Sequence, residues 1–341
     1  MATLTLIYES LFSNEYKTTL KESVVIASLL AVYNFSSYYS NFLVDETVTT
    51  ITLLGGFYLG SAWIQTFFSK DETHLKFYIL FEVLARSFSK YLSHNKQLET
   101  QKLLTNAETN NLLFVFVKIF YIPVMLNFTF SNYGAVSDLF FRLQFYKISD
   151  FTIIHWYKLL LPIFFLVDTS YFLFGYLIES KKLGSTVRSV DKSTLSWLVT
   201  LACYPPFNSV STIIFPWYAN DSNLIFPSIL NYTLLSLIIL LFGIYLSATI
   251  SLGSKCSNLT NRGTVNRGMY KYIRHPAYSA KVLAWWLMTI PIMNVFVFLS
   301  MLMWSVIYLV RALKEEDHLL QDREYQEYFR NTPYRFIPKI F

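Results

Sequence analysis

The sequence predicts an all-α fold, a polytopic transmembrane helical bundle of about seven to nine spans that ends in a helical hairpin and a polar tail. Hydrophobic residues make up 54% of the 341 residues and charged residues only 15%, whereas a soluble domain carries roughly 25% charged residues. Aromatic residues reach 18%, and Tyr and Trp favour the headgroup level of a bilayer. A soluble fold of this size cannot hide that much apolar surface.

A spanning helix needs about 20 mostly apolar residues. The candidate spans, in chain order, are Ser23–Leu43, Thr49–Phe68, Lys76–Leu92, Asn111–Phe130, Trp156–Ile178, Leu195–Trp217, Leu224–Leu252, Tyr278–Met293 and Val295–Leu313. The last two are separated only by Asn294, which predicts a helical hairpin with a tight turn. The third candidate carries Glu82 and Arg86, which can pair at i, i+4 on one helix face, and an interfacial helix is the alternative there.

Basic loops predict the orientation of the helices in the membrane. Segment Lys181–Lys192 is basic, Ala219–Asn223 is acidic through Asp221, and Lys255–His275 carries no acid. This alternation fits helices that cross in, out and in again. The hairpin then returns Arg311–Phe341 to the cytosolic side, where Lys255–His275 also lies.

The chain divides by content into three regions. Residues 1–150 form N-terminal transmembrane helices without a readable motif, residues 151–254 form central transmembrane helices, and residues 255–341 carry the functional motifs. Asp168 lies in an apolar run, so it is either a functional carboxylate or a polar bridge to another helix or to the backbone at Pro205-Pro206. The two prolines predict a break or kink in their helix.

The segment Arg274-His-Pro-Ala-Tyr278 enters the membrane directly after a basic loop. Pro276 disfavours helix at His275 and suits the first turn of a new helix, so His275 should lie in a fixed extended turn. Unpaired N–H groups at a helix start favour a carboxylate or another acceptor. The turn therefore predicts a pocket for an amino-acid-like ligand, whereas a basic loop bound to anionic headgroups is the alternative for Arg267 and Lys271.

A second polar block, Arg311–Leu320, follows the hairpin. Arg311 and Glu315 are spaced i, i+4 and share a helix face, so a weak surface ion pair is one interpretation. The other is a binding site near the His275 turn. A guanidinium group can hold a carboxylate by two hydrogen bonds, and Glu315 can accept from an ammonium group or a ribose hydroxyl.

These motifs, in this order and spacing, resemble the isoprenylcysteine carboxyl methyltransferase family of membrane methyltransferases. The matching elements are Gly268-Met-Tyr270, Arg274-His-Pro-Ala-Tyr278, the hairpin, Arg311 with Glu315-Glu316, and Tyr325-Gln-Glu-Tyr328. Upstream, Ser257–Gly263 and Cys203–Phe207 resemble a bacterial-type branch of the family. Met269 stands where the family commonly has Pro, and Ala280 where Gly is usual.

The resemblance implies an S-adenosylmethionine-dependent methyltransferase whose acceptor is lipid-like, foremost the carboxylate of an isoprenylcysteine-like substrate. Arg311 would face that carboxylate. The resemblance and the position of the motifs place the following residues at the cofactor: Lys255, Arg262, Gly263, Thr264, Val265, Tyr270, His275, Pro276, Ala277, Tyr278 and Glu315. The implied protein is a multi-pass membrane protein, in the cell inner membrane if bacterial, with its cofactor-binding tail on the cytosolic side. We expect no nucleic-acid partner and no metal.

The implied chemistry needs few catalytic groups. A sulfonium methyl group is already activated, and a carboxylate or thiolate is already a nucleophile. The enzyme must mainly place the two in line and exclude water.

Three other functions stay open at the level of sequence. The acceptor can instead be a phospholipid amine or a small thiol. The tail Thr332–Pro338 also resembles sterol reductases, which would use a nicotinamide cofactor, although Glu315-Glu316 and the His-Pro-x-Tyr turn favour the methyl donor. A membrane transporter built on Asp168 and the Pro-broken helix is the alternative of another class, and it leaves Arg274–Tyr278 without a role.

Overall fold

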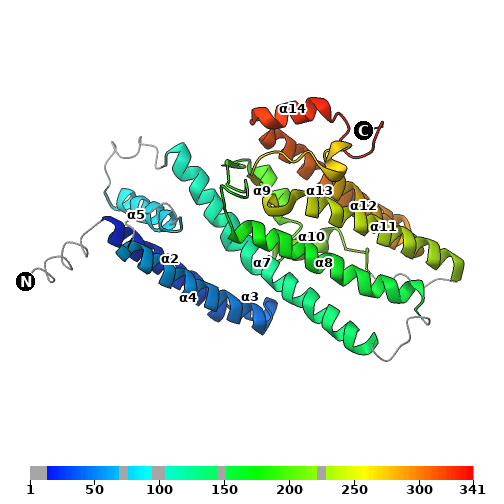
Figure 1. Cartoon of the computed structure of the whole chain (residues 1–341), viewed down its shortest axis with the longest axis horizontal. Helices are drawn as coiled ribbons and strands as arrows, with labels where there is room; N and C mark the ends of the chain where they lie inside the picture. The colour runs from blue at the N-terminus through cyan, green and yellow to red at the C-terminus, as the bar shows by residue number, and fades with distance from the viewer. Residues whose placement is uncertain (1–13, 69–75, 94–103, 144–150, 221–227, 341) are drawn as a thin grey trace, which may run out of the picture. The chain divides into compact units, whose positions relative to one another are not determined.

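The computed structural model describes residues 14–68, 76–93, 104–143, 151–220 and 228–340, and most of them are helical (Figure 1). The chain forms two compact units, Met1–Pro123 and Val124–Phe341. The boundary falls inside one long helix, α7 (Asn106–Leu143). The all-α prediction is confirmed.

Before α7, the described residues of the first unit form four helices: α2 (Asn14–Phe35), α3 (Ser37–Phe42), α4 (Asp45–Phe68) and α5 (Tyr78–Ser93). Helix α2 packs against α4 and α5, and its buried Glu22 accepts hydrogen bonds from the Tyr58 hydroxyl and the Tyr78 N–H. The predicted pair of Glu82 and Arg86 is present on α5, with 3.4 Å between Oε2 and Nη2.

The core of the second unit lies between the helices α8 (Ile153–Leu177), α11 (Ser228–Leu252), α12 (Pro276–Thr289) and α13 (Val295–Leu319). Helix α11 packs against α8 on one side and α12 on the other (Figure 1). Their facing side chains form the main core, which includes Phe242, Trp285 and Met301. The core therefore fixes the ends of these helices relative to one another.

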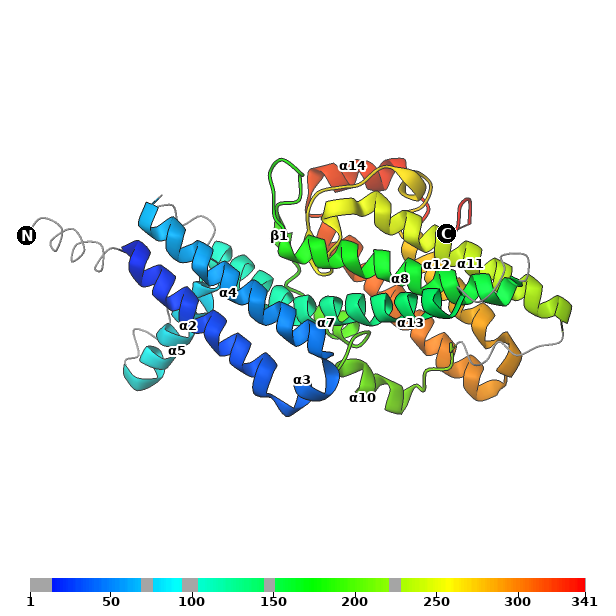
Figure 2. The ribbon, with the colours of Figure 1, turned by 60° about the horizontal axis from the view of Figure 1, so that its bottom comes forward.

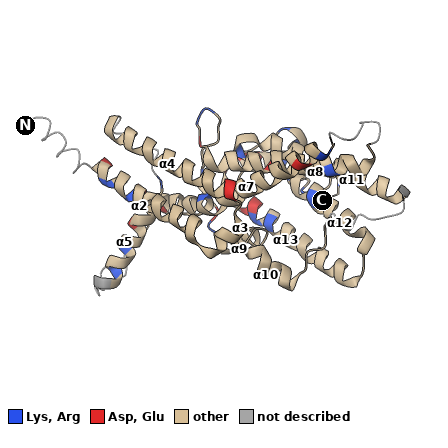
Figure 3. Ribbon diagram, turned by 90° about the horizontal axis from the view of Figure 1, so that it is seen from below, with Lys and Arg blue, Asp and Glu red and all other residues tan. Residues whose placement is uncertain are grey.

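Five described helices are long and apolar enough to cross a membrane, namely Asp45–Phe68, Asn106–Leu143, Ile153–Leu177, Ile229–Lys255 and Val295–Leu319. Figure 3 shows how few charged residues the long helices carry. Together these features confirm a multi-pass transmembrane helical protein. The predicted total of about seven to nine spans stays a prediction.

The predicted span Leu195–Trp217 differs most from the structure. It consists of two short helices, α9 (Thr194–Leu201) and α10 (Phe207–Ile214). The break lies at Pro205-Pro206, where the missing N–H groups and the rings cannot continue a helix. The predicted break is therefore confirmed, and a single continuous span at this place is wrong.

The predicted hairpin is confirmed. Helix α12 ends at Thr289, and a short 3₁₀ turn η5 (Ile290–Ile292) follows. The Asn294 side chain then caps α13 by accepting from the N–H groups of Phe296 and Val297. In the middle of the hairpin Trp286 Nε1 donates to Ser305 Oγ at 2.9 Å. The two helices thus run antiparallel, and the start of α12 lies beside the end of α13.

The polar segments meet at that end of the unit. Strand β1 (Ser189–Val190) pairs with β2 (Thr260–Asn261) in antiparallel register, so the two basic loops are joined. Helix α14 (Arg323–Asn331) lies at the same edge (Figure 2), and Arg188 forms a 2.7 Å ion pair with Asp322 just before it. The prediction that these segments share one side is confirmed. The acidic turn at Asp221 lies outside the described residues.

Candidate functional site

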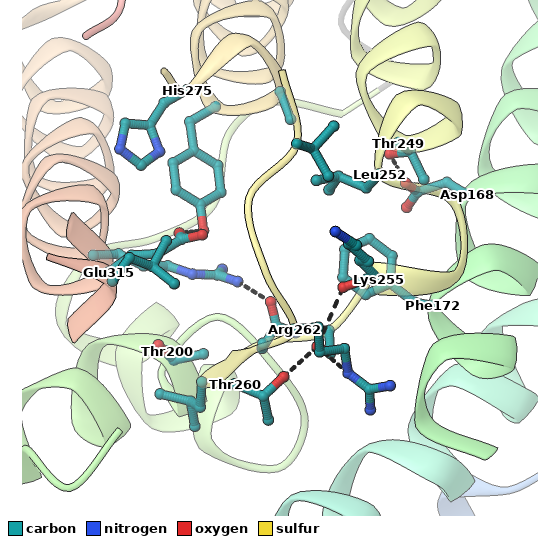
Figure 4. A pocket seen from close by; sticks show the side chains of 18 of the residues that line it. Asp168, Phe172, Thr200, Thr249, Leu252, Lys255, Thr260, Arg262, His275 and Glu315 are labelled. Atoms are coloured by element: carbon teal, nitrogen blue, oxygen red, sulfur yellow. Dashed lines mark hydrogen bonds between the residues drawn. The ribbon is translucent and has the colours of Figure 1, made fainter. Parts of the chain in front are cut away.

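A cavity of about 400 Å³ opens where the polar segments meet the ends of the helices. Its walls come from α8, α11, α12, α13 and the loop between α11 and α12. Figure 4 shows His275 and Glu315 on one side of this pocket and Asp168, Phe172 and Thr249 on the opposite side. Residues more than 100 positions apart in the chain therefore share one cavity.

The sequence-predicted site residues gather at this cavity. Those that line it are Lys255, Arg262, Gly263, Thr264, Val265, Tyr270, His275, Ala277, Tyr278, Arg311 and Glu315. Pro276 does not line it, because it is buried as the first residue of α12. Its contribution is to the turn, since its fixed φ suits a helix start and sets the direction of His275.

A buried carboxylate, Glu316, holds the His275 turn. Glu316 Oε1 accepts from His275 Nε2 at 3.1 Å and from Arg274 Nε at 2.7 Å. Its other oxygen accepts from Arg335 Nη2 at 2.8 Å. The sequence paired Glu315 and Glu316 in one motif, and only the fold shows that the second is the anchor, whereas the first faces the cavity.

The C-terminal tail binds two N–H groups of the turn that precedes α12. Arg274 N donates to the Tyr334 carbonyl at 3.0 Å, and His275 N donates to the Arg335 carbonyl at 2.9 Å. Ser279 Oγ adds a bond to the Phe336 carbonyl at 2.9 Å. The N–H groups of Arg274 and His275, just before the helix, are therefore bound by the tail and not by a ligand.

Tyr278 and Glu315 form the accessible part of the site. The Tyr278 hydroxyl donates to Glu315 Oε2 at 2.8 Å, and Glu315 is exposed. The rings of His275 and Tyr278 stack at 5.4 Å with an interplanar angle of 4°. A flat aromatic wall thus lies beside an ionisable carboxylate, a combination that suits a ligand with both a ring system and hydrogen-bond donors.

Arg311 is buried in an aromatic box. Its guanidinium carbon lies 5.2 Å from the Tyr278 ring centroid and also faces the rings of Tyr204 and Tyr308. Nη2 donates to Asn258 Oδ1 at 2.5 Å. Within the described part of the chain, no carboxylate lies at ion-pair distance, so the alternative of a surface pair with Glu315 is wrong. A buried cation with spare donors favours an anionic ligand.

The loop of Lys255 to Val265 is fixed by its own polar contacts. Lys255 Nζ donates to the Thr264 carbonyl at 3.1 Å, and Arg262 Nη1 donates to the Ser185 carbonyl at 2.7 Å. Gly263 has φ +89, a backbone conformation that favours glycine, and a Cβ there would lie 2.7 Å from Arg188 Nη2. The buried Thr264 hydroxyl has no hydrogen-bond partner among the residues that the structure describes.

Asp168 is the polar bridge to another helix that the sequence allowed. It accepts from Tyr245 and Thr249 on α11, each at 2.6 Å, and not from the backbone at Pro205-Pro206. It also lines the cavity. Its hydrogen bonds tie α8 to α11 at the depth of the pocket.

The fold and the site define a class: a multi-pass helical membrane protein whose polar, aromatic-walled cavity is closed by a transmembrane hairpin and a tail. Residues 225–322 match the sequence pattern of the isoprenylcysteine carboxyl methyltransferase (ICMT) family. The matched region contains α12, α13 and the cavity residues from Tyr245 to Glu315. No curated protein matches the chain by sequence. Membership in a bacterial-type branch stays a prediction.

Proposed function

We propose that the protein transfers a methyl group from S-adenosylmethionine to the carboxylate of a lipid-like acceptor of the isoprenylcysteine type. One observation carries the proposal. Arg311, a buried guanidinium with no carboxylate partner in the described residues, lines the same cavity as the residues that the family resemblance assigns to the cofactor.

The residues of the cavity fit the cofactor. Glu315 offers an exposed carboxylate for hydroxyl or ammonium donors, and the buried Thr264 hydroxyl offers a hydrogen bond that no described residue takes. The stacked rings of His275 and Tyr278 offer a flat apolar wall. When bound, S-adenosylmethionine supplies a methyl group that is already activated for transfer.

The protein's own contribution is then placement and exclusion of water. The Arg311 guanidinium holds the acceptor carboxylate, and Asn258 fixes the guanidinium. The rings of Tyr204, Tyr278 and Tyr308 surround the charged group and keep water away from it. Holding the two reactants in line in a dry cavity is enough for a transfer that needs neither a metal nor a covalent intermediate.

A second cavity supports a lipid-like acceptor. It has a volume of about 730 Å³ and is lined mainly by apolar side chains, among them Phe242, Trp285 and Met288. It shares Asn132, Phe165 and Lys281 with the first cavity. An acceptor can therefore place its carboxylate at Arg311 and its apolar part in this space. We also propose that the first cavity opens to the cytosolic side, as the basic loops around it indicate.

Binding of S-adenosylmethionine to the purified protein tests the cofactor assignment. We expect saturable binding in the parent, loss of binding in Glu315→Ala and His275→Ala, and unchanged binding in Lys314→Ala, which alters a residue of α13 that does not line the cavity. A thermal denaturation midpoint for each variant separates lost binding from lost folding. If the Glu315 and His275 variants bind like the parent, the assignment is wrong.

Membranes incubated with labelled methyl donor test the acceptor. A base-labile methyl ester on a lipid-linked acid supports the proposal, and label on a phospholipid amine or a thiol supports the alternative acceptors. The transporter alternative has less support, since both carboxylate oxygens of Asp168 are engaged by α11.

A further inference from the structure

Lys281 lies at the junction of the two cavities. It projects from α12 two turns before Met288 and lines both spaces. Its ammonium group lies over the rings of Tyr245 and Trp285, 5.1 Å and 5.4 Å from their centroids. Neither the proposed cofactor contacts nor the proposed carboxylate contact uses this residue.

The ammonium group has no hydrogen bond or ion pair with any residue that the structure describes. Asp168 acts on it electrostatically but forms no ion pair with it, and both Asp168 oxygens accept from α11. A lysine at the depth of a membrane helix is costly unless an anion or a polar cavity compensates it. Three N–H donors are therefore available to a ligand.

The charged side chains around the second cavity are mostly positive. Besides Lys281, its charged lining residues are Arg142, Lys158 and a single acid, Asp138. Cations therefore outnumber acids there. Arg311 lines only the first cavity, so its positive charge adds to those of the cations around the second cavity. This distribution favours an acceptor with more than one negative charge.

We propose that Lys281 binds a second anionic group of the acceptor, separate from the carboxylate that Arg311 holds. The substrate class is then an amphipathic lipid-like molecule that carries a methylatable carboxylate and a further carboxylate or phosphate near its apolar part. This inference rests on the proposed function for the role of Arg311. The role of Lys281 itself is a matter of binding and can be measured without methyl transfer.

Two probes test it: S-farnesylcysteine acylated on nitrogen with an acetyl group, which has one carboxylate, and the same compound acylated with a succinyl group, which has two. Equilibrium binding of each to the detergent-solubilised full chain is measured for the parent, Lys281→Met, Lys281→Arg and Lys271→Met. The last variant removes an exposed lysine outside both cavities as a matched control.

We expect the parent to bind the succinyl probe at least about tenfold more tightly than the acetyl probe, because a hydrogen bond to a charged group has roughly that effect. Lys281→Met should abolish the preference for the succinyl probe and leave the affinity for the acetyl probe within about twofold of the parent. Lys281→Arg and Lys271→Met should keep the preference for the succinyl probe. Equal binding of both probes by the parent, no binding of either, or a preference that survives in Lys281→Met overturns the inference. Methyl transfer to the acetyl probe without a succinyl preference overturns it and leaves the proposed function standing.

Discussion

His275 and Glu316 are joined by a 3.1 Å hydrogen bond between the imidazole Nε2 and carboxylate Oε1, across the two helices of the hairpin. Their side chains are only 6% and 3% exposed, respectively. Arg274 shares the same oxygen and Arg335 binds the other. One carboxylate thus connects the start of α12, the end of α13 and the tail.

Glu316→Gln should destabilise the protein strongly. The substitution removes the negative charge that binds Arg274, His275 and Arg335. Breaking a buried charge pair costs about 3–5 kcal/mol. We expect a clear fall in the thermal denaturation midpoint in detergent. Glu315→Gln, one residue earlier and exposed, is the matched control and should keep the midpoint but weaken S-adenosylmethionine binding. Equal midpoints for the two variants would contradict the anchoring role of Glu316.

Arg311→Lys should impair use of the acceptor without affecting the cofactor. Lysine keeps the charge but loses the planar group that stacks on the tyrosines and binds a carboxylate by two hydrogen bonds. We expect kcat/KM for the acceptor to fall roughly tenfold to hundredfold, since a hydrogen bond to a charged group contributes about 1.5–3 kcal/mol. The measurement is methyl transfer at saturating cofactor, with cofactor binding measured alongside. A variant that loses cofactor affinity instead would place Arg311 at the other ligand.

Gly175→Ala should disturb the packing of α8 under the pocket. A Cβ at this position would lie 1.9 Å from the carbonyl oxygen of Cys256, so the backbone must shift. Overpacking of this kind costs about 1–3 kcal/mol, which should lower the denaturation midpoint. Gly243→Ala on α11 is the matched control, because a Cβ there meets nothing within 4 Å. A Gly175 variant as stable as the Gly243 variant would show that the helix is not held this close.

The ion pair of Asp322 should make the loop contacts dependent on pH. Burial raises the pKa of Asp322, but the hydrogen bonds that it accepts, from Arg188 above all, outweigh burial and hold the pKa below its usual value. Because the pKa of Asp322 is lower in the folded state, its charge stabilises the fold at pH values above the unfolded-state pKa, which is near 3.9. That contribution is lost as the pH falls through the folded-state pKa.

Asp322→Asn isolates this effect, because asparagine keeps the N-cap of α14 but not the charge. We expect the parent to exceed the variant in denaturation midpoint near pH 6, and the difference to shrink as the pH falls below about 4. A difference that does not change with pH would mean that the Arg188 pair contributes nothing through charge.

Much of the architecture follows from the sequence because membrane helices are specified locally. Five of the apolar runs, the hairpin around Asn294 and the break at Pro205-Pro206 are confirmed, since length, capping and missing N–H groups act within a few residues. The boundaries were less predictable. The predicted span Lys76–Leu92 corresponds to α5, a helix of 16 residues. The ion pairs that α5 forms with other helices of the first unit cannot be read from a hydropathy pattern.

The gathering of the site was predictable through the motifs, and its internal partners were not. The order of His275, Arg311 and Glu315 around a hairpin predicts that they meet, and they do line one cavity. That Asn258 binds Arg311, or that tail carbonyls take the N–H groups of the His275 turn, depends on contacts between segments far apart in the chain. No local pattern carries such information.

The carbonyl groups of Tyr334 and Arg335 are the acceptors for the turn on which His275 stands. Both residues follow the hairpin in the chain. A chain truncated before residue 334 would therefore keep α12 and α13 yet lack the two acceptors of the turn. Assembly of the site is in this sense a late event that depends on the tail.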